Sequence, residues 1–180
     1  MILKVEEPVR KFQSQIIRSK MAANPNIRLI LEDRGVKGEH RVRDLHPIGV
    51  RENGKVAPVL EGTKYPTKVV TKESGHQIVC DPTLAYYSTR LQTERITTAV
   101  EARKLSETIG TGINVADPFC GVGPALAHLV NTHGLVSSIL ASDLNPEAIK
   151  LLNENLSKWI GMPSDPEITG IREWKKGVWS

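Results

Sequence analysis

The 180-residue sequence is poor in cysteine and in aromatic residues, and it contains no long apolar stretch. Cys80 and Cys120 are its only two cysteines, and they lie 40 residues apart without forming a CxxC pair. The sequence therefore predicts neither a disulfide framework nor a metal site. No run of 18 apolar residues is present, and the first seven residues carry acids where a signal peptide has its apolar segment. We expect no membrane span and a cytoplasmic protein.

Net charge is only mildly positive, with 24 basic against 20 acidic residues, but the basic residues are unevenly spread. Between residues 10 and 51, ten basic residues face four acidic ones. This excess has two interpretations, a solvated surface or a face that contacts the phosphates of a nucleic acid. The ten residues are Arg10, Lys11, Arg18, Lys20, Arg28, Arg34, Lys37, Arg41, Arg43 and Arg51.

The first 80 residues predict a small β-rich module of the α+β class. Apolar spacing favours a short helix over residues 8–22, which ends at Asn24-Pro25. Short strands are expected at residues 27–31, 41–43, 67–71 and 76–80, and the last two have the spacing of a hairpin. Residues 49–66, rich in glycine, proline and lysine, are expected to form a flexible or inserted connection.

Residues 81–180 predict a second domain of the α/β class. A helix over residues 90–108 precedes an apolar strand at 113–117, a glycine turn with a short helix, and a second strand at 138–142. A further helix is expected after Asn145, an N-cap candidate, with Pro146 at its first position. Residues 171–176 suggest a short strand or a tail. This alternation is typical of a parallel, doubly wound, Rossmann-like sheet, whose ligands bind at the carboxyl ends of the strands.

Acids and glycines gather at those predicted strand ends. Asp117 ends the first strand, Gly121 and Gly123 follow in the turn, and Asp143 ends the second strand. An acid in the last position suits the two hydroxyls of a ribose, which indicates an adenosine-containing ligand. The G-x-G pattern lacks the third glycine of a dinucleotide site, so S-adenosylmethionine fits better than NAD. The alternative is that the glycines merely form a tight turn between strand and helix.

Three segments carry a family resemblance: residues 86–95 (YYSTRLQTER), 119–124 (FCGVGP) and 143–148 (DLNPEA). In this order and spacing, they resemble the tRNA (guanine-37 N1)-methyltransferases and their relatives of the wybutosine pathway, which transfer an aminocarboxypropyl group. The resemblance is clear from about residue 67 to residue 156. A weaker likeness over residues 27–43 points to the small RNA-facing β module of that family. The resemblance as a whole implies a class I methyltransferase core, S-adenosylmethionine as cofactor and tRNA as partner.

The resemblance also implies roles for single residues. Arg90 and Glu94 would line the pocket of the target guanine. Methylation of guanine N1 requires removal of the N1 proton, and a carboxylate base with a cation near O6 supplies the groups needed. Residues four apart on a helix share one face, which is also the arrangement of an ordinary salt bridge. The implied cofactor contacts are Tyr86, Arg95, Asp117, Phe119, Gly121, Gly123 and Asp143.

The chain is shorter than a complete core of this type, which has about seven strands and a later Asn-Pro-Pro loop that this sequence lacks. We therefore interpret it as a fragment, a truncated product or a divergent short form. An incomplete sheet leaves an exposed edge, which favours self-association. Three functions stay open at this point. They are methylation of guanine 37, which the Arg90-Leu91 pair favours, aminocarboxypropyl transfer, and a noncatalytic module that binds RNA or cofactor.

Overall fold

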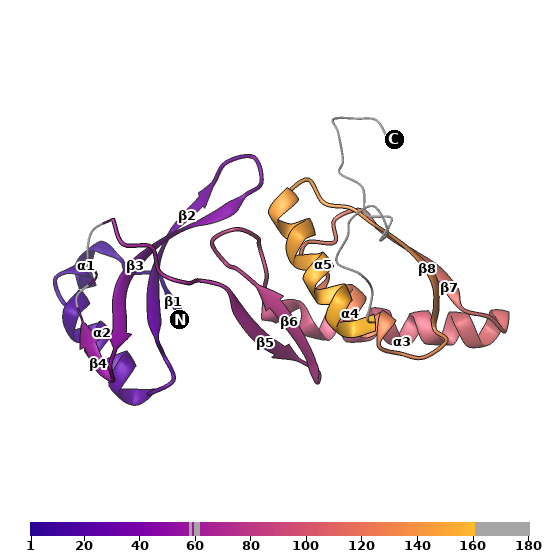
Figure 1. Cartoon of the computed structure of the whole chain (residues 1–180), viewed down its shortest axis with the longest axis horizontal. Coiled ribbons are helices and arrows are strands. Elements are labelled where there is room, and N and C mark those ends of the chain that lie inside the picture. Colours follow the sequence, from indigo (N-terminus) through magenta and orange to yellow (C-terminus); the bar gives the residue numbers. More distant parts are fainter. Residues whose placement is uncertain (58, 60–61, 161–180) are drawn as a thin grey trace. The chain divides into compact units, whose positions relative to one another are not determined.

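The computed structural model describes residues 1–57, 59 and 62–160 of the chain. Contacts divide the chain into two compact units, residues 1–67 and residues 68–180 (Figure 1). The sequence analysis placed the boundary between residues 80 and 81 instead. The difference is the hairpin of β5 (Val69–Glu73) and β6 (His76–Cys80), which packs against helix α5 (Pro146–Ile160) and so belongs with the second unit. The strand or tail suggested for residues 171–176 lies outside the described residues.

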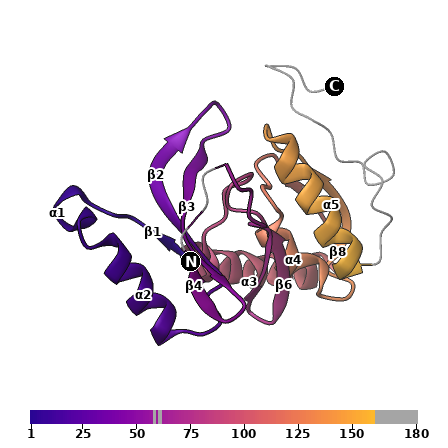
Figure 2. The same ribbon diagram turned by 60° about the vertical axis from the view of Figure 1, so that its left-hand side comes forward.

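The first unit is a four-stranded sheet with two helices. Strand β1 (Ile2–Leu3) runs parallel to β2 (Leu29–Lys37), which pairs antiparallel with β3 (Val42–Glu52), and β3 pairs antiparallel with β4 (Lys55–Ala57). Helices α1 (Glu7–Arg10) and α2 (Gln13–Ala23) lie to one side of these strands in Figure 2. Helix α2 packs through Ile17 and Met21. The predicted α+β class of this unit is confirmed.

Strands β3 and β4 correct one expectation. Residues 49–66 were expected to form a flexible or inserted connection, but residues 49–57 belong largely to a hairpin. The turn is closed by Asn53 and Gly54, both with positive φ (48° and 77°), which suits a tight two-residue connection. Residue 49, in β3, has no room for a side chain, because a Cβ there would lie 2.5 Å from the Ile17 side chain. Glycine at this position therefore allows α2 to pack closely on the strand and does not mark a flexible segment.

The second unit alternates strands and helices, as predicted. After the hairpin come a 3-10 turn (η1, Thr89–Leu91), helix α3 (Gln92–Ile109), strand β7 (Ile113–Asp117), helix α4 (Pro124–Val130), strand β8 (Val136–Ala141) and helix α5. Strands β7 and β8 pair in parallel, Asp117 opposite Ala141. The core between this sheet and its helices contains Leu126, Leu152 and Leu156. The parallel pair and its helices confirm the Rossmann-like α/β class.

Candidate functional site

The carboxyl ends of β7 and β8 bring the glycine turn and both predicted acids together. Asp117 is the last residue of β7, and its carboxylate accepts a hydrogen bond from the Phe119 amide at 3.2 Å. Asp143 follows β8 and accepts hydrogen bonds from the amides of Gly121 and Asn145, both at 2.8 Å. Segments separated by more than 20 residues thus form one polar loop cluster at the edge where parallel sheets bind ligands.

The two glycines of the turn serve different purposes. Gly123 has φ +81° and no room for a side chain, because a Cβ would lie 2.4 Å from Leu152 Cδ1 on α5. It therefore allows α5 to pack on the turn. At Gly121 (φ +54°) a Cβ would meet only the Tyr86 carbonyl oxygen, at 3.8 Å. Space next to the Gly121 backbone is open, which is the property a ligand-binding glycine needs.

Electrostatically, the two acids differ. Burial raises the pKa of Asp117, and the negative charge of Asp143 acts in the same direction, against the hydrogen bond from the Phe119 amide. The Asp143 carboxylate has two backbone amide donors, and each of its oxygens carries a second lone pair. Asp143 therefore combines a fixed orientation with acceptor capacity for hydroxyl groups.

Aromatic side chains next to the turn are exposed. Phe119 is 87% exposed and Tyr86 is 54% exposed, although large apolar groups usually lie inside. Cys120, between Phe119 and Gly121, is buried, and burial raises its thiol pKa above its ordinary value of 9.0. Its thiol is thus a packing group of the core, whereas Phe119 and Tyr86 offer flat apolar surface.

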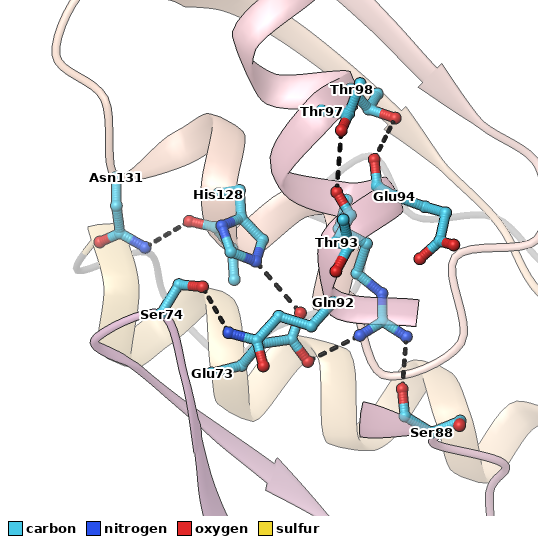
Figure 3. A network of polar contacts seen from close by, with 12 residues as sticks. Glu73, Ser74, Ser88, Gln92, Thr93, Glu94, Thr97, Thr98, His128 and Asn131 are labelled. Atoms are coloured by element: carbon cyan, nitrogen blue, oxygen red, sulfur yellow. Dashed lines mark hydrogen bonds and ion pairs between the residues drawn. The ribbon is translucent and has the colours of Figure 1, made fainter. Parts of the chain in front are cut away.

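Arg90 and Glu94 occupy the start of the long helix. Arg90 lies in η1, where its amide donates to the Ser88 hydroxyl at 3.3 Å, and Glu94 lies in the first turn of α3. Both residues are exposed. Over the described part of the chain, neither side chain forms an ion pair, so the salt bridge that their spacing also allowed is not made. Figure 3 shows the Glu94 carboxylate without a dashed contact, while the backbone carbonyl of Glu94 accepts from Thr98 Oγ1.

The neighbouring Arg95 faces into the protein. Its guanidinium donates to Glu73 Oε2 at 2.6 Å and to the Ser88 carbonyl at 2.9 Å, and its side chain is only 10% exposed. Tyr87 donates to the same Glu73 oxygen at 2.7 Å. The other oxygen of Glu73 lies 3.1 Å from His128 Nε2 on α4. Arg95 as a cofactor contact stays a prediction, because these contacts account for its guanidinium without one.

Burial disfavours the charged form of Glu73, but the hydrogen bonds to this carboxylate stabilise that form more strongly. Desolvation acts to raise the pKa of this carboxyl, and hydrogen bonds from Tyr87, Arg95 and His128 outweigh it, so the pKa lies below its ordinary value of 4.5. The pKa of Tyr87 is raised above 10.0, first by burial and then by its hydrogen bond to Glu73. Glu73 is therefore a buried, ionised carboxylate with three partners from different parts of the second unit.

A second buried polar residue holds the glycine turn from behind. The Asn155 side chain on α5 accepts from the Val79 amide at 2.8 Å and donates to the carbonyls of Val79 at 3.0 Å and Val122 at 2.9 Å. It thus ties the hairpin strand β6 to the turn between Gly121 and Gly123. Asn145 caps α5 by accepting from the Glu147 amide at 3.0 Å, as the sequence predicted.

In the first unit, about half of the basic cluster is committed to internal partners. Arg10 and Arg34 form ion pairs with the buried Glu32, Lys37 with Asp44, and Arg43 with Asp33. Arg51 donates to main-chain carbonyls. The other five basic side chains of this cluster form no ion pair with the described residues: Lys11, Arg18, Lys20, Arg28 and Arg41. The surface available to a polyanion is smaller than the composition suggests.

None of the helices within residues 1–57, 59 and 62–160 is long and apolar enough to cross a membrane. The same part of the chain contains no group of three or more His, Cys, Asp or Glu side chains that could hold a metal ion.

Comparison with known families decides the relationship. The model of the TRM5/TYW2 methyltransferase domain matches residues 69–158, which is half of the chain. The chain belongs to the TRM5/TYW2 family. The match begins at β5 and ends within α5, so it includes the hairpin, the start of α3 and both strand ends of the candidate site. The predicted family resemblance is thereby confirmed.

Single relatives of the TRM5/TYW2 family agree with this assignment. The tRNA (guanine(37)-N(1))-methyltransferase Trm5b of Pyrococcus abyssi is 30% identical over 156 residues, which cover 86% of this chain and 40% of that protein. The crystal structure of Trm5b from Pyrococcus abyssi superposes with a TM-score of 0.66 at 25% identity and covers 96% of this chain and 43% of that one. A complex of aTrm5 with tRNALeu gives 0.63 at 28% identity, covering 87% and 40%. The chain spans about two-fifths of the length of these relatives.

The sequence singled out the glycine turn, both acids, Arg90 and Glu94, whose roles stay predictions, but it gave no indication of the buried contacts of Glu73, His128 and Asn155. Glu73 lies in a polar hairpin and Asn155 in an amphipathic helix. In both settings a polar residue is expected to face solvent and not to belong to a buried network. The only sequence signal for Asn155 was its place on the apolar stripe of α5, three residues after Leu152. Buried polar networks depend on tertiary contacts that periodicity does not encode.

Proposed function

We propose that this chain carries the S-adenosylmethionine site and the guanine-recognising helix start of an enzyme that methylates N1 of guanine 37 in tRNA. The observation that carries the proposal is the convergence of Asp117, Gly121 and Asp143 at the strand ends of a TRM5/TYW2 domain. Tyr86, Phe119 and Gly123 complete the proposed cofactor contacts. The names of the relatives support methylation of guanine 37.

The residues fit the cofactor. The open backbone at Gly121 admits a ligand close to the turn, and the oriented Asp143 carboxylate can accept from two ribose hydroxyls. Asp117 offers a carboxylate that could pair with the sulfonium or the amino group of the cofactor. S-adenosylmethionine supplies an electrophilic methyl group on a sulfonium. Because the glycine pattern lacks a third glycine, a diphosphate would find an incomplete cradle.

In the proposed reaction, Glu94 removes the N1 proton of guanine while Arg90 stabilises the negative charge that grows on O6. The N1 lone pair forms the new bond to the methyl carbon as the carbon–sulfur bond breaks. The electron pair of that bond stays on sulfur and leaves a neutral thioether. Exposure of Glu94, without an ion pair among the described residues, keeps its carboxylate available to a substrate.

The test is transfer to tRNA transcripts that differ only at position 37. The chain, alone and joined to the remaining part of a full-length relative, is incubated with S-adenosylmethionine and a transcript with guanine or adenine at that position. The tRNA is then digested to nucleosides, which are separated by chromatography and identified by mass spectrometry. We expect N1-methylguanosine from the guanine transcript only. An aminocarboxypropyl product would establish the alternative reaction, and unmodified guanosine with both forms of the protein would contradict the proposed methyl transfer.

A further inference from the structure

The buried carboxylate of Glu73 lies where three elements of the second unit meet. It ends strand β5 and is fully buried, with a side-chain exposure of 0%. One oxygen binds Arg95 of α3 and Tyr87, and the other lies against His128 of α4. Figure 3 shows Glu73 between α4, which follows the glycine turn, and the first turn of α3.

From Glu73 a continuous chain of contacts leads to the helix start. The second terminal nitrogen of Arg95 donates to the Ser88 carbonyl at 2.9 Å, and the Ser88 hydroxyl accepts from the Arg90 amide at 3.3 Å. A parallel contact joins the same two parts, because Gln92 Nε2 donates to the Ser74 hydroxyl at 2.7 Å. Glu94 precedes Arg95 directly and lies between these anchors and the rest of α3.

These contacts are arranged around the proposed site rather than around the core alone. A buried carboxylate needs partners wherever it lies, so satisfaction of Glu73 by itself indicates only stability. Its partners here come from the segment that presents Arg90 and Glu94 and from the helix that begins at Pro124, directly after Gly123. Arg95 is suited to this bridge, because one planar guanidinium spans the carboxylate and the Ser88 carbonyl in fixed directions.

We propose that Glu73 is a positioning residue: through Arg95 it holds the η1–α3 start, and so sets where Arg90 and Glu94 stand relative to the glycine turn. The inference rests on the proposed function for its catalytic consequence, but not for its structural content. It concerns a residue that touches neither guanine nor cofactor and acts only through Arg95.

The structural content is tested by hydrogen–deuterium exchange on the 180-residue chain. Glu73→Gln keeps the size and an acceptor for Tyr87 but removes the charge that holds Arg95. Arg95→Lys keeps the charge but cannot span both acceptors. Both variants should speed exchange at the amides of residues 90–98 by about tenfold or more, as expected for loss of a hydrogen bond to a charged group. The matched control, Glu101→Gln, removes an exposed carboxylate of the same helix that pairs with Lys104.

The catalytic consequence is tested by methyl transfer with the same variants. Glu73→Gln should lower kcat by about 10- to 100-fold through misplacement of the reacting groups, and leave the KM for S-adenosylmethionine unchanged. Equal exchange at residues 90–98 in Glu73→Gln, Arg95→Lys and Glu101→Gln would overturn the inference. If the parent transfers no methyl group while exchange still responds to the first two variants alone, the proposed function fails and the positioning role of Glu73 stands.

Discussion

A carboxylate that acts as a base must be reachable by its substrate and must not be neutralised by a neighbour. Glu94 meets both conditions at the first turn of α3, where it is exposed and forms no ion pair within the described residues. The side chain of Arg95, the next residue, is neither exposed nor unpaired, because its guanidinium donates to Glu73 and to the Ser88 carbonyl. Helical geometry alone turns these neighbours by about 100°, so the Glu94 side chain is exposed while the Arg95 side chain faces into the protein.

The first prediction concerns Glu94→Gln. This change preserves side-chain size and removes the base, so single-turnover methyl transfer to a guanine-37 transcript should slow by about 10²- to 10⁴-fold. The measurement uses this chain joined to the remaining part of a full-length relative. Glu101→Gln, seven residues further along the same helix, should leave the rate unchanged. Near-parental rates in Glu94→Gln would reduce Glu94 to a residue that only orients the guanine.

At the scale of elements, the hairpin β5–β6 acts as a platform for the site. Its turn end contributes Glu73 and Ser74, which hold the start of α3, and β6 is clamped by Asn155 of α5. Two helices that flank the candidate site are thus fixed to the same pair of strands. Buried polar contacts therefore help to specify this arrangement.

A second prediction follows for the stability of this platform. Near neutral pH, Glu73→Gln should lower the free energy of unfolding by about 3 to 5 kcal/mol, because it leaves Arg95 buried without a counter-charge. The folded-state pKa of Glu73 lies below 4.5, so this contribution is present above that value and is lost as pH falls through the folded pKa. Urea denaturation at several pH values between 7 and 3 measures the difference, which should shrink at the acid end. A pH-independent difference would show that the pKa of Glu73 is the same in the folded and unfolded protein, which would contradict the lowered folded-state pKa.

Sequence reasoning succeeded where a local pattern dictates local structure. Strand β7 was predicted at residues 113–117 and found there, and the Asn145-Pro146 signal located the start of α5. It failed where glycine had a tertiary cause: Gly49 and Gly54 suggested a flexible connection, but one allows a helix to pack and the other closes a hairpin. The contacts of Glu73 span up to 55 residues, and no periodicity in the sequence reports such a distance.

At the scale of the whole molecule, the two units offer different chemistry. The second carries the candidate cofactor turn, whereas the first carries the basic cluster, of which Lys11, Arg18, Lys20, Arg28 and Arg41 form no ion pair among the described residues. Internal pairing of Arg10, Arg34, Lys37 and Arg43 means that net charge overstates the number of phosphates the unit can neutralise.

The third prediction is that tRNA binding falls steeply with salt and depends on the basic residues that form no ion pair within the described part of the chain. Each phosphate neutralised on duplex nucleic acid contributes about 0.9 to the log–log slope. Replacing Arg18 and Lys20 by Gln should lower the slope by about 2 in filter binding between low and moderate salt. Lys37→Gln, which removes a lysine paired with Asp44, is the matched control and should change it little. No salt dependence would return the cluster to an ordinary solvated surface.

The central claim is that the carboxyl ends of β7 and β8 bind S-adenosylmethionine, with Asp143 after β8 as a contact of its ribose. Isothermal titration of the 180-residue chain tests this claim most directly. We predict measurable binding of S-adenosylmethionine or its demethylated product by the parent. Asp143→Ala should weaken this binding by at least about tenfold, the loss of one charge-assisted hydrogen bond. The variant also loses the hydrogen bonds from the Gly121 and Asn145 amides, so circular dichroism checks that its fold is intact. Equal affinity of the folded variant and the parent would contradict the assignment.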